Sequence, residues 1–141
     1  MKKRDFLKTS LAAATTAFLP KTIMAMGKTK DLLRTAHIGV GGMGFSDLKS
    51  IASHPKVKVA ALCDVDSNAI AKASSIYPDA KTFKDYRVML KSLANEVDAV
   101  VVSTPDHSHA PASIMAMEMN KAVYCQKPLA HHVSEVRDMR H

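Results

Sequence analysis

The sequence has no tryptophan, and only 5% of its residues are aromatic. Its two cysteines, Cys63 and Cys125, are too few for a disulfide framework and lack the spacing of a metal site. It contains no run of about 18 apolar residues, so it predicts no membrane-spanning helix. Repeats and low-complexity tracts are absent as well. The remaining composition, 47% apolar residues in a chain of 141, is typical of a globular protein with room for one domain.

The charge of the chain is distributed unevenly along its length. The formal net charge is +7, a basic balance that by itself suggests a nucleic-acid partner. Residues 1–30, however, contain seven basic side chains and one acid, whereas residues 31–141 contain 13 basic and 12 acidic ones. The first segment therefore carries +6 of the charge and the second only +1. The basicity belongs to a leader, and we expect no nucleic-acid partner.

The leader has the layout of a secretory signal. A basic start is followed by nine weakly apolar residues, 11–19, which are too few to span a bilayer. The segment Lys3-Arg4-Asp5-Phe6-Leu7-Lys8 resembles the twin-arginine export signal, with a lysine in place of the first arginine. We interpret residues 1–30 as a twin-arginine-like signal peptide and linker, and expect a periplasmic or otherwise exported protein. The alternative is an ordinary amphipathic N-terminal helix.

Residues 31–141 alternate between strand and helix patterns. Short apolar runs predict strands at 35–40, 57–62, 81–83, 97–103 and 122–125. Helical spacing of apolar residues predicts helices at 43–53, 67–76, 85–93 and 110–119. A last helix is expected to begin at Val133 and to be cut off at His141. This alternation predicts an α/β fold, a Rossmann-type doubly wound parallel sheet that is incomplete at its C-terminus.

A glycine-rich turn joins the first predicted strand to the first predicted helix. Its sequence, Gly39-Val40-Gly41-Gly42-Met43-Gly44, fits the G-x-G-x-x-G pattern of dinucleotide-binding domains. The first glycine would permit the tight turn, the second a close approach to a pyrophosphate, and the last close packing of helix on strand. The helix N-terminus would add free N–H groups and a positive dipole. The candidate cofactor contacts in this turn are Gly39, Gly41, Gly42, Met43 and Gly44.

An acidic residue, Asp64, ends the second predicted strand 20 residues after Gly44. A carboxylate at this position of a dinucleotide-binding unit accepts hydrogen bonds from the adenosine ribose, and it repels a 2′-phosphate. We therefore expect NAD as the cofactor, with NADP less favoured. The alternative is a glycine-rich turn that is only structural.

Two further motifs follow in the sequence. The segment Ser103–Pro111 contains T-P-x-x-x-H, and Val123–Leu129 contains Gln-Lys-Pro where the related motif is E-K-P. With the glycine-rich turn, and in this order and spacing, these motifs resemble the Gfo/Idh/MocA oxidoreductase family over residues 35–141. The resemblance implies an NAD-binding Rossmann domain and action on sugars, cyclitols and related polyols. It also implies a second, C-terminal substrate domain, which this sequence does not contain.

The resemblance assigns roles position by position. Thr104 and Pro105 would lie against the cofactor at the end of the fourth strand, and His109 would join them at the start of the next helix. Lys127 would reach toward substrate and nicotinamide, as the candidate catalytic residue and a further cofactor contact. Gln126 stands where the family usually has glutamate, so it keeps the size and hydrogen-bonding ability of that residue but loses its charge.

The predicted chemistry needs a group that handles a proton. A hydride leaves a carbinol carbon as a proton leaves its oxygen, and that proton requires an acceptor within hydrogen-bond reach. Lys127 could take up this proton or polarise the oxygen. The alternative is a lysine in a surface loop without such a role.

Other polar residues are expected to be structural. His107 and His109 form an H-x-H pair, but no third ligand is suitably spaced, so we predict no metal site. Cys63 and Cys125 fall in predicted strands, where buried and inert thiols are expected. A run of basic side chains is expected to be solvated: Lys81, Lys84, Arg87 and Lys91.

The sequence thus predicts the NAD-binding portion of an oxidoreductase that transfers hydride between a nicotinamide cofactor and a carbohydrate-like small molecule. We expect the fragment alone to be inactive. One alternative is a glycosidase that uses NAD for transient oxidation and elimination. Another is a truncated nucleotide-binding module without activity. Homo-oligomerisation through the C-terminal domain is left open.

Overall fold

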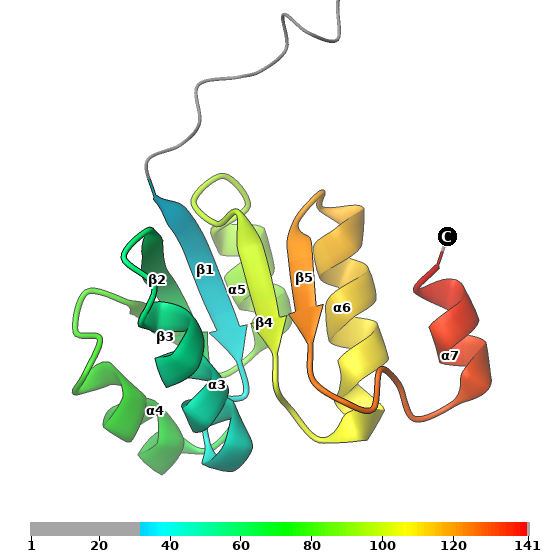
Figure 1. The fold of residues 1–141 in the computed structure, drawn as a ribbon, viewed down its shortest axis with the longest axis horizontal. Helices are drawn as coiled ribbons and strands as arrows, with labels where there is room; N and C mark the ends of the chain where they lie inside the picture. Colours follow the sequence, from blue (N-terminus) through cyan, green and yellow to red (C-terminus); the bar gives the residue numbers. More distant parts are fainter. Residues whose placement is uncertain (1–31, 141) are drawn as a thin grey trace, which may run out of the picture. The chain divides into compact units, whose positions relative to one another are not determined.

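Five parallel strands form one sheet in the order β3-β2-β1-β4-β5 (Figure 1). The computed structural model describes residues 32–140, so the predicted signal peptide lies outside the described residues. The strands are β1 (Leu33–Ile38), β2 (Val57–Cys63), β3 (Lys81–Phe83), β4 (Ala99–Val102) and β5 (Ala122–Cys125). The helices are α3 (Gly42–Ala52), α4 (Ser67–Ser74), α5 (Tyr86–Ser92), α6 (His109–Glu118) and α7 (Val133–Asp138), with a short 3₁₀ turn, η1 (Asp106–Ser108), before α6. The predicted Rossmann-type α/β fold is confirmed.

The strand order reverses beside β1. From β1 the chain moves outward through β2 to β3, then crosses back to β4 and continues to β5. The strand β1 therefore has β2 on one side and β4 on the other, both parallel to it. The loops that leave β1 and β4 diverge to opposite faces of the sheet, and such a switch point opens a crevice at the carboxyl ends of the strands.

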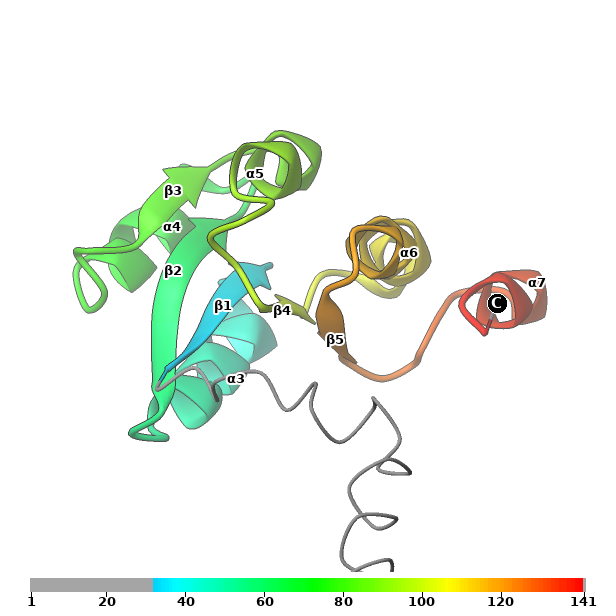
Figure 2. The ribbon, with the colours of Figure 1, turned by 90° about the horizontal axis from the view of Figure 1, so that it is seen from above.

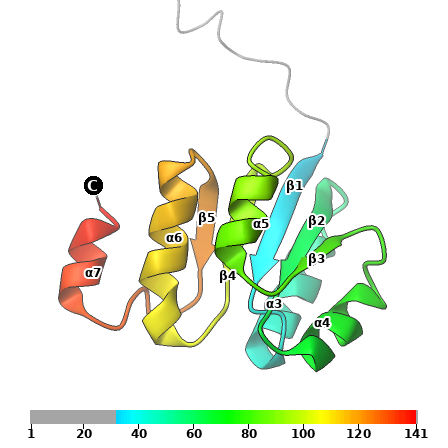
Figure 3. The same cartoon turned by 180° about the vertical axis from the view of Figure 1, so that it is seen from behind.

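Helices cover both faces of the sheet, as the view from above shows (Figure 2). On one face α3 and α4 pack over a core that includes Leu48 and Leu62. On the other face α5 and α6 pack over a second core, which includes Met89 and Val100 (Figure 3). Both faces of the central strands are therefore buried, which is why these strands read as nearly continuous apolar runs.

Several element ends differ from the predicted ones. The strand β1 ends at Ile38, so Gly39 belongs to the following turn. The helix α4 ends at Ser74 rather than near residue 76, and the hydroxyls of Ser74 and Ser75 donate to carbonyl oxygens of its last turn. The last helix was predicted to continue past residue 140, but α7 ends at Asp138. No helix among residues 32–140 is long and apolar enough to cross a membrane.

A buried histidine lies in β1. His37 is 1% exposed, and its Nε2 lies 3.0 Å from Thr35 Oγ1. Its Nδ1 has no hydrogen-bond partner among the described residues. Burial lowers the pKa of His37 from 6.5 to about 4, and the negative charge of Asp47 opposes this shift only in part. The imidazole is therefore neutral in the folded protein at pH 7.

We expect the free energy of unfolding to fall as the pH drops from 6.5 to about 4. In this range the unfolded chain binds a proton at His37 that the folded chain does not bind, and the loss from this residue reaches about 3 kcal/mol. Above pH 6.5 the imidazole is neutral in both the folded and the unfolded chain, so His37 no longer lowers the free energy of unfolding. Urea unfolding at a series of pH values measures the slope. His37→Leu should remove this part of the slope, and an unchanged slope in that variant would contradict the assignment.

Candidate functional site

A cavity of about 590 Å³ lies at the switch point, at the carboxyl ends of β1, β2 and β4. Its wall is made by the turn after β1, the end of β2, the start of α5 and the loop after β4. Residues of that wall include Gly39, Gly41, Asp64, Val65, Lys84, Asp85, Tyr86, Arg87, Ser103, Thr104 and Pro105. Five of the predicted cofactor contacts therefore surround one cavity.

Two glycines allow the turn after β1 to approach the end of β4. Gly39 has φ +80°, and a Cβ there would lie 2.6 Å from the carbonyl oxygen of Ser103. A Cβ on Gly44 would overlap the carbonyl oxygen of Gly39. Any larger residue at either position would therefore push the helix α3 away from the sheet. The first helical bond of α3 runs from the N–H of Phe45 to the carbonyl of Gly41, at 3.2 Å.

The N-terminus of α3 consequently offers free donors beside the cavity. The N–H groups of Gly42, Met43 and Gly44 precede the first helical bond and have no partner within the helix. Such N–H groups, with the positive end of the helix dipole, form a site for phosphate groups. Gly42 and Met43 are exposed, whereas Gly44 is buried beneath the turn.

Asp64 holds the glycine-rich turn from the side of β2. Its Oδ2 accepts hydrogen bonds from the backbone N–H groups of Val40 (2.8 Å) and Gly41 (3.2 Å). Its Oδ1 accepts one from the N–H of Asp66 (3.0 Å) and so retains a lone pair. The carboxylate also lines the cavity. Asp64 is therefore placed to orient the turn and to accept a ligand hydroxyl; its contact with ribose stays a prediction.

Thr104 and Pro105, in the loop after β4, also line the cavity. The hydroxyl Oγ1 of Thr104 is buried and has no hydrogen-bond partner among the described residues. A buried polar group without a partner is costly unless a ligand or water supplies one. This hydroxyl is therefore a candidate for contact with a bound molecule.

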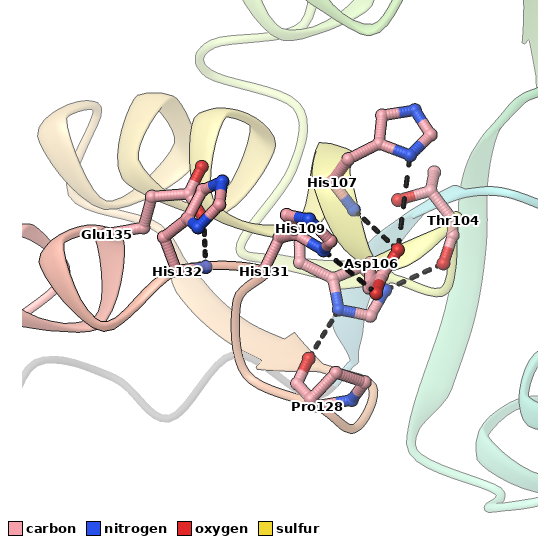
Figure 4. A network of polar contacts seen from close by, with 8 residues as sticks. All are labelled: Thr104, Asp106, His107, His109, Pro128, His131, His132 and Glu135. Carbon is pink, nitrogen blue, oxygen red and sulfur yellow. Dashed lines mark hydrogen bonds and ion pairs between the residues drawn. The ribbon is translucent and has the colours of Figure 1, made fainter.

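His109 joins two loops instead of lining the cavity. It is 1% exposed, and its Nε2 lies 2.7 Å from the carbonyl oxygen of Thr104 (Figure 4). Its Nδ1 lies 2.6 Å from the carbonyl oxygen of Pro128. Both ring nitrogens thus face backbone carbonyls, so His109 connects the loop after β4 to the loop after β5. Its predicted contact with the cofactor stays a prediction.

A second contact between the same loops lies at the surface. His131 Nδ1 is 3.2 Å from a carboxylate oxygen of Asp106, as Figure 4 shows. The hydrogen bond from His131 holds the pKa of Asp106 below its ordinary value. Nearby, the Glu135 carboxylate accepts a hydrogen bond from the N–H of His132 at 2.8 Å and closes the first turn of α7.

Among residues 32–140, no group of three or more acidic, histidine or cysteine side chains could hold a metal ion.

Lys127 follows β5 at the same edge of the sheet. Its side chain is exposed and is not part of the cavity wall. Its backbone N–H donates to Gln126 Oε1 at 2.7 Å, and its peptide bond to Pro128 is cis. The fold therefore places Lys127 at the carboxyl edge of the sheet, where the cavity also lies. These contacts do not test its predicted catalytic role, which stays a prediction.

The sequence patterns did not identify several residues in and next to the site. Lys84 and Arg87, expected on a solvated run, contribute to the cavity wall. Arg87 pairs with Asp85 at 3.0 Å, and its pKa is raised chiefly by the charge of Tyr86 and then by that of Asp85. Asp47 was not singled out at all, although its carboxylate accepts a hydrogen bond from Gln126 Nε2 at 3.0 Å. The only sequence feature that pointed to it was Gln126, which stands where the related motif has a glutamate.

The two cysteines, both predicted to be buried, differ in how far they are buried. Cys63 is 2% exposed, and burial raises the pKa of its thiol to about 12. Cys125 is only partly buried, and burial raises its pKa as well. Few thiolates form at neutral pH when the pKa is raised in this way, and the inertness of Cys63 stays a prediction.

A parallel sheet with a glycine-rich turn at its switch point and an acid after β2 defines a dinucleotide-binding Rossmann domain. The chain belongs to the Gfo/Idh/MocA family: the model of this family, described as an oxidoreductase family with an NAD-binding Rossmann fold, matches residues 33–141. Residues 33–141 are thus an NAD-binding oxidoreductase domain.

Similar proteins include sugar- and cyclitol-related enzymes. A glycosyl hydrolase family 109 protein of Stenotrophomonas maltophilia is 33% identical over 136 residues, 89% of this chain and 29% of that protein. An inositol 2-dehydrogenase of Salmonella paratyphi B is 30% identical over 100 residues, 70% of this chain and 29% of that protein. The crystal structure of a myo-inositol 2-dehydrogenase from Lactobacillus plantarum, 30% identical, matches with a TM-score of 0.71 over 77% of this chain and 32% of its own. The chain spans about three tenths of the length of the curated relatives it matches.

We expect His109→Ala to destabilise the domain by about 2–4 kcal/mol, because it removes a buried ring and the contacts of its two nitrogens with the carbonyl oxygens of Thr104 and Pro128. The matched control is His107→Ala, an exposed histidine two residues away, for which a change within about 0.5 kcal/mol is expected. Urea unfolding of both variants measures the difference. Equal, small effects would show that His109 does not connect the two loops.

Proposed function

We propose that this chain is the cofactor-binding part of an exported oxidoreductase that transfers hydride between NAD and a sugar, cyclitol or glycoside. The observation that carries the proposal is the cavity at the switch point, which combines the N-terminus of α3 with the Asp64 carboxylate. The relatives named inositol 2-dehydrogenase support a cyclitol or sugar as substrate. A C-terminal domain that supplies most of the substrate pocket is part of the proposal.

The cavity and the helix N-terminus beside it fit the parts of NAD. The free N–H groups at Gly42 and Met43, which do not line the cavity, suit the pyrophosphate. The Asp64 carboxylate suits the adenosine ribose, because its Oδ1 keeps a lone pair for a hydroxyl. The Thr104 hydroxyl, buried without a partner among the described residues, would gain one from the bound cofactor. When bound, NAD supplies the acceptor for the hydride.

Lys127 is the proposed proton-handling residue. Its exposed amine lies on the loop after β5, which His109 ties to the cavity loop after β4 through the carbonyls of Pro128 and Thr104. The amine Nζ would take the proton of the substrate hydroxyl in oxidation and return it in reduction.

A second candidate function is glycoside cleavage through transient oxidation. The similarity to a glycosyl hydrolase family 109 protein favours it. In such a reaction NAD is regenerated within each turnover and a glycosidic bond breaks, whereas a dehydrogenase accumulates NADH. A module that binds nucleotide without turnover is the third alternative, and NADH formation by the longer protein would exclude it.

We expect Asp64→Ala to weaken NAD binding by about tenfold or more, because the variant loses hydrogen bonds between a charged acceptor and ribose. NADP binding should change less, so the preference for NAD should shrink. Isothermal titration with both nucleotides measures this. Asp66→Ala, which removes only the helix cap of α4, serves as the matched control and should keep the preference. An unchanged preference in Asp64→Ala would contradict the assigned contact.

The proposed export depends on residues 1–30. Replacing Lys3 and Arg4 together by Gln should retain the protein in the cytoplasm, because the paired basic residues are the part of the signal that resembles the twin-arginine pattern. Fractionation of cells that produce the full chain measures the distribution. Replacing Lys21 and Lys30 by Gln removes the same charge elsewhere in the leader and should leave export intact. Continued export after the first change would refute the proposed route.

A further inference from the structure

A polar cluster joins three segments at the carboxyl edge of the sheet. Asp47 lies on α3, three residues after Gly44. Its carboxylate accepts a hydrogen bond from Ser103 Oγ at 2.7 Å, at the end of β4. It also accepts from Gln126 Nε2, at 3.0 Å to Oδ2 and 3.3 Å to Oδ1, at the end of β5. The other end of that amide, Oε1, accepts from the backbone N–H of Lys127 at 2.7 Å.

These contacts explain why residue 126 is a glutamine. A carboxylate only accepts and a backbone N–H only donates, so Gln126 must turn its NH₂ group to Asp47 and its oxygen to Lys127. A glutamate at this position would place a second carboxylate against Asp47 with no proton between them, in a partly buried setting. The amide at position 126 is therefore matched to the acid on α3.

The cluster also connects the lysine to the phosphate-binding turn. The helix α3 begins at that turn, and the turn packs directly on the end of β4 at Ser103. The backbone N–H of Gln126 donates to the carbonyl of Val102 at 2.9 Å, which places the end of β5 next to the end of β4. A shift of α3 would thus displace Asp47 and, through its hydrogen bonds, the Gln126 side chain and the backbone of Lys127.

We propose that Asp47 is a positioning residue for Lys127. Its carboxylate holds the Gln126 side chain, which holds the Lys127 backbone, so the lysine turn and the phosphate-binding helix form one rigid unit. Asp47 is not part of the cavity wall, and it reaches Lys127 through Gln126. The inference rests on the proposed NAD site only where it concerns the effect of the nucleotide on the lysine.

The test reverses donor and acceptor across the contact. Gln126→Glu alone sets two carboxylates against each other. The double variant Asp47→Asn/Gln126→Glu supplies an amide donor from α3 to the new carboxylate and restores the hydrogen bond. Asn95→Asp, in the exposed turn between α5 and β4, adds the same charge as Gln126→Glu and serves as the matched control.

The first readout is amide hydrogen exchange by NMR in the full 141-residue chain without nucleotide. We expect exchange at Lys127 to be about tenfold faster in Gln126→Glu, and within about twofold of the unmodified chain in the double variant and in the control. Exchange in the core strand β4, measured at Val101, should not change. Faster exchange at Val101 as well, an unchanged Lys127, or failure of the double variant to restore it would overturn the proposal.

The second readout is labelling of the Lys127 amine by an amine-selective reagent, with and without NAD. NAD should slow labelling in the unmodified chain and in the double variant, and should lose this effect in Gln126→Glu. NAD that slows labelling equally in Gln126→Glu would overturn the coupling. If NAD does not slow labelling in the unmodified chain while the exchange results are as expected, the nucleotide-site proposal fails and the positioning role of Asp47 stands.

Discussion

The candidate site depends on one close approach between two stretches of backbone, the turn after β1 and the end of β4. At Gly39 a Cβ would meet the Ser103 carbonyl, and at Gly44 it would meet the Gly39 carbonyl. Because no side chain separates these segments, α3 starts against the sheet, and its free N–H groups lie at the glycine-rich turn that lines the cavity. Asp64 completes the arrangement, since its carboxylate holds the turn through the N–H groups of Val40 and Gly41.

The loops around the cavity are held by partly buried polar contacts between different segments. His109 lies between the carbonyls of Thr104 and Pro128, and Asp47 binds the Gln126 amide. Contacts of this kind fix a site because side chains with several hydrogen-bond partners cannot move without losing several contacts at once. An exposed lysine on a loop can in this way occupy a defined place beside the cavity, as the proposed chemistry requires.

The order of strands and helices could be predicted from the sequence because periodicity and glycine spacing are local properties. The same holds for the residues around the turn, from Gly39 to Asp64. The contacts of His109 could not be predicted, because its partners lie on two different loops and no local pattern shows which carbonyls meet its ring. Lys84 and Arg87 were predicted to be solvated basic side chains, because their spacing does not reveal that α5 begins at the cavity wall. Gln126 did signal a change in its surroundings, but only the fold shows that the cause is Asp47, on a distant helix.

The proposed function requires that NAD binds at the turn between β1 and α3. NMR titration of the 141-residue chain with NAD, which follows each backbone amide, measures this binding. We expect saturable shifts at Gly41, Gly42 and Met43, with further shifts at Asp64 and Thr104, and little change at the opposite edge of the sheet. Saturable shifts confined to another surface, or no shifts at saturating nucleotide, would contradict it.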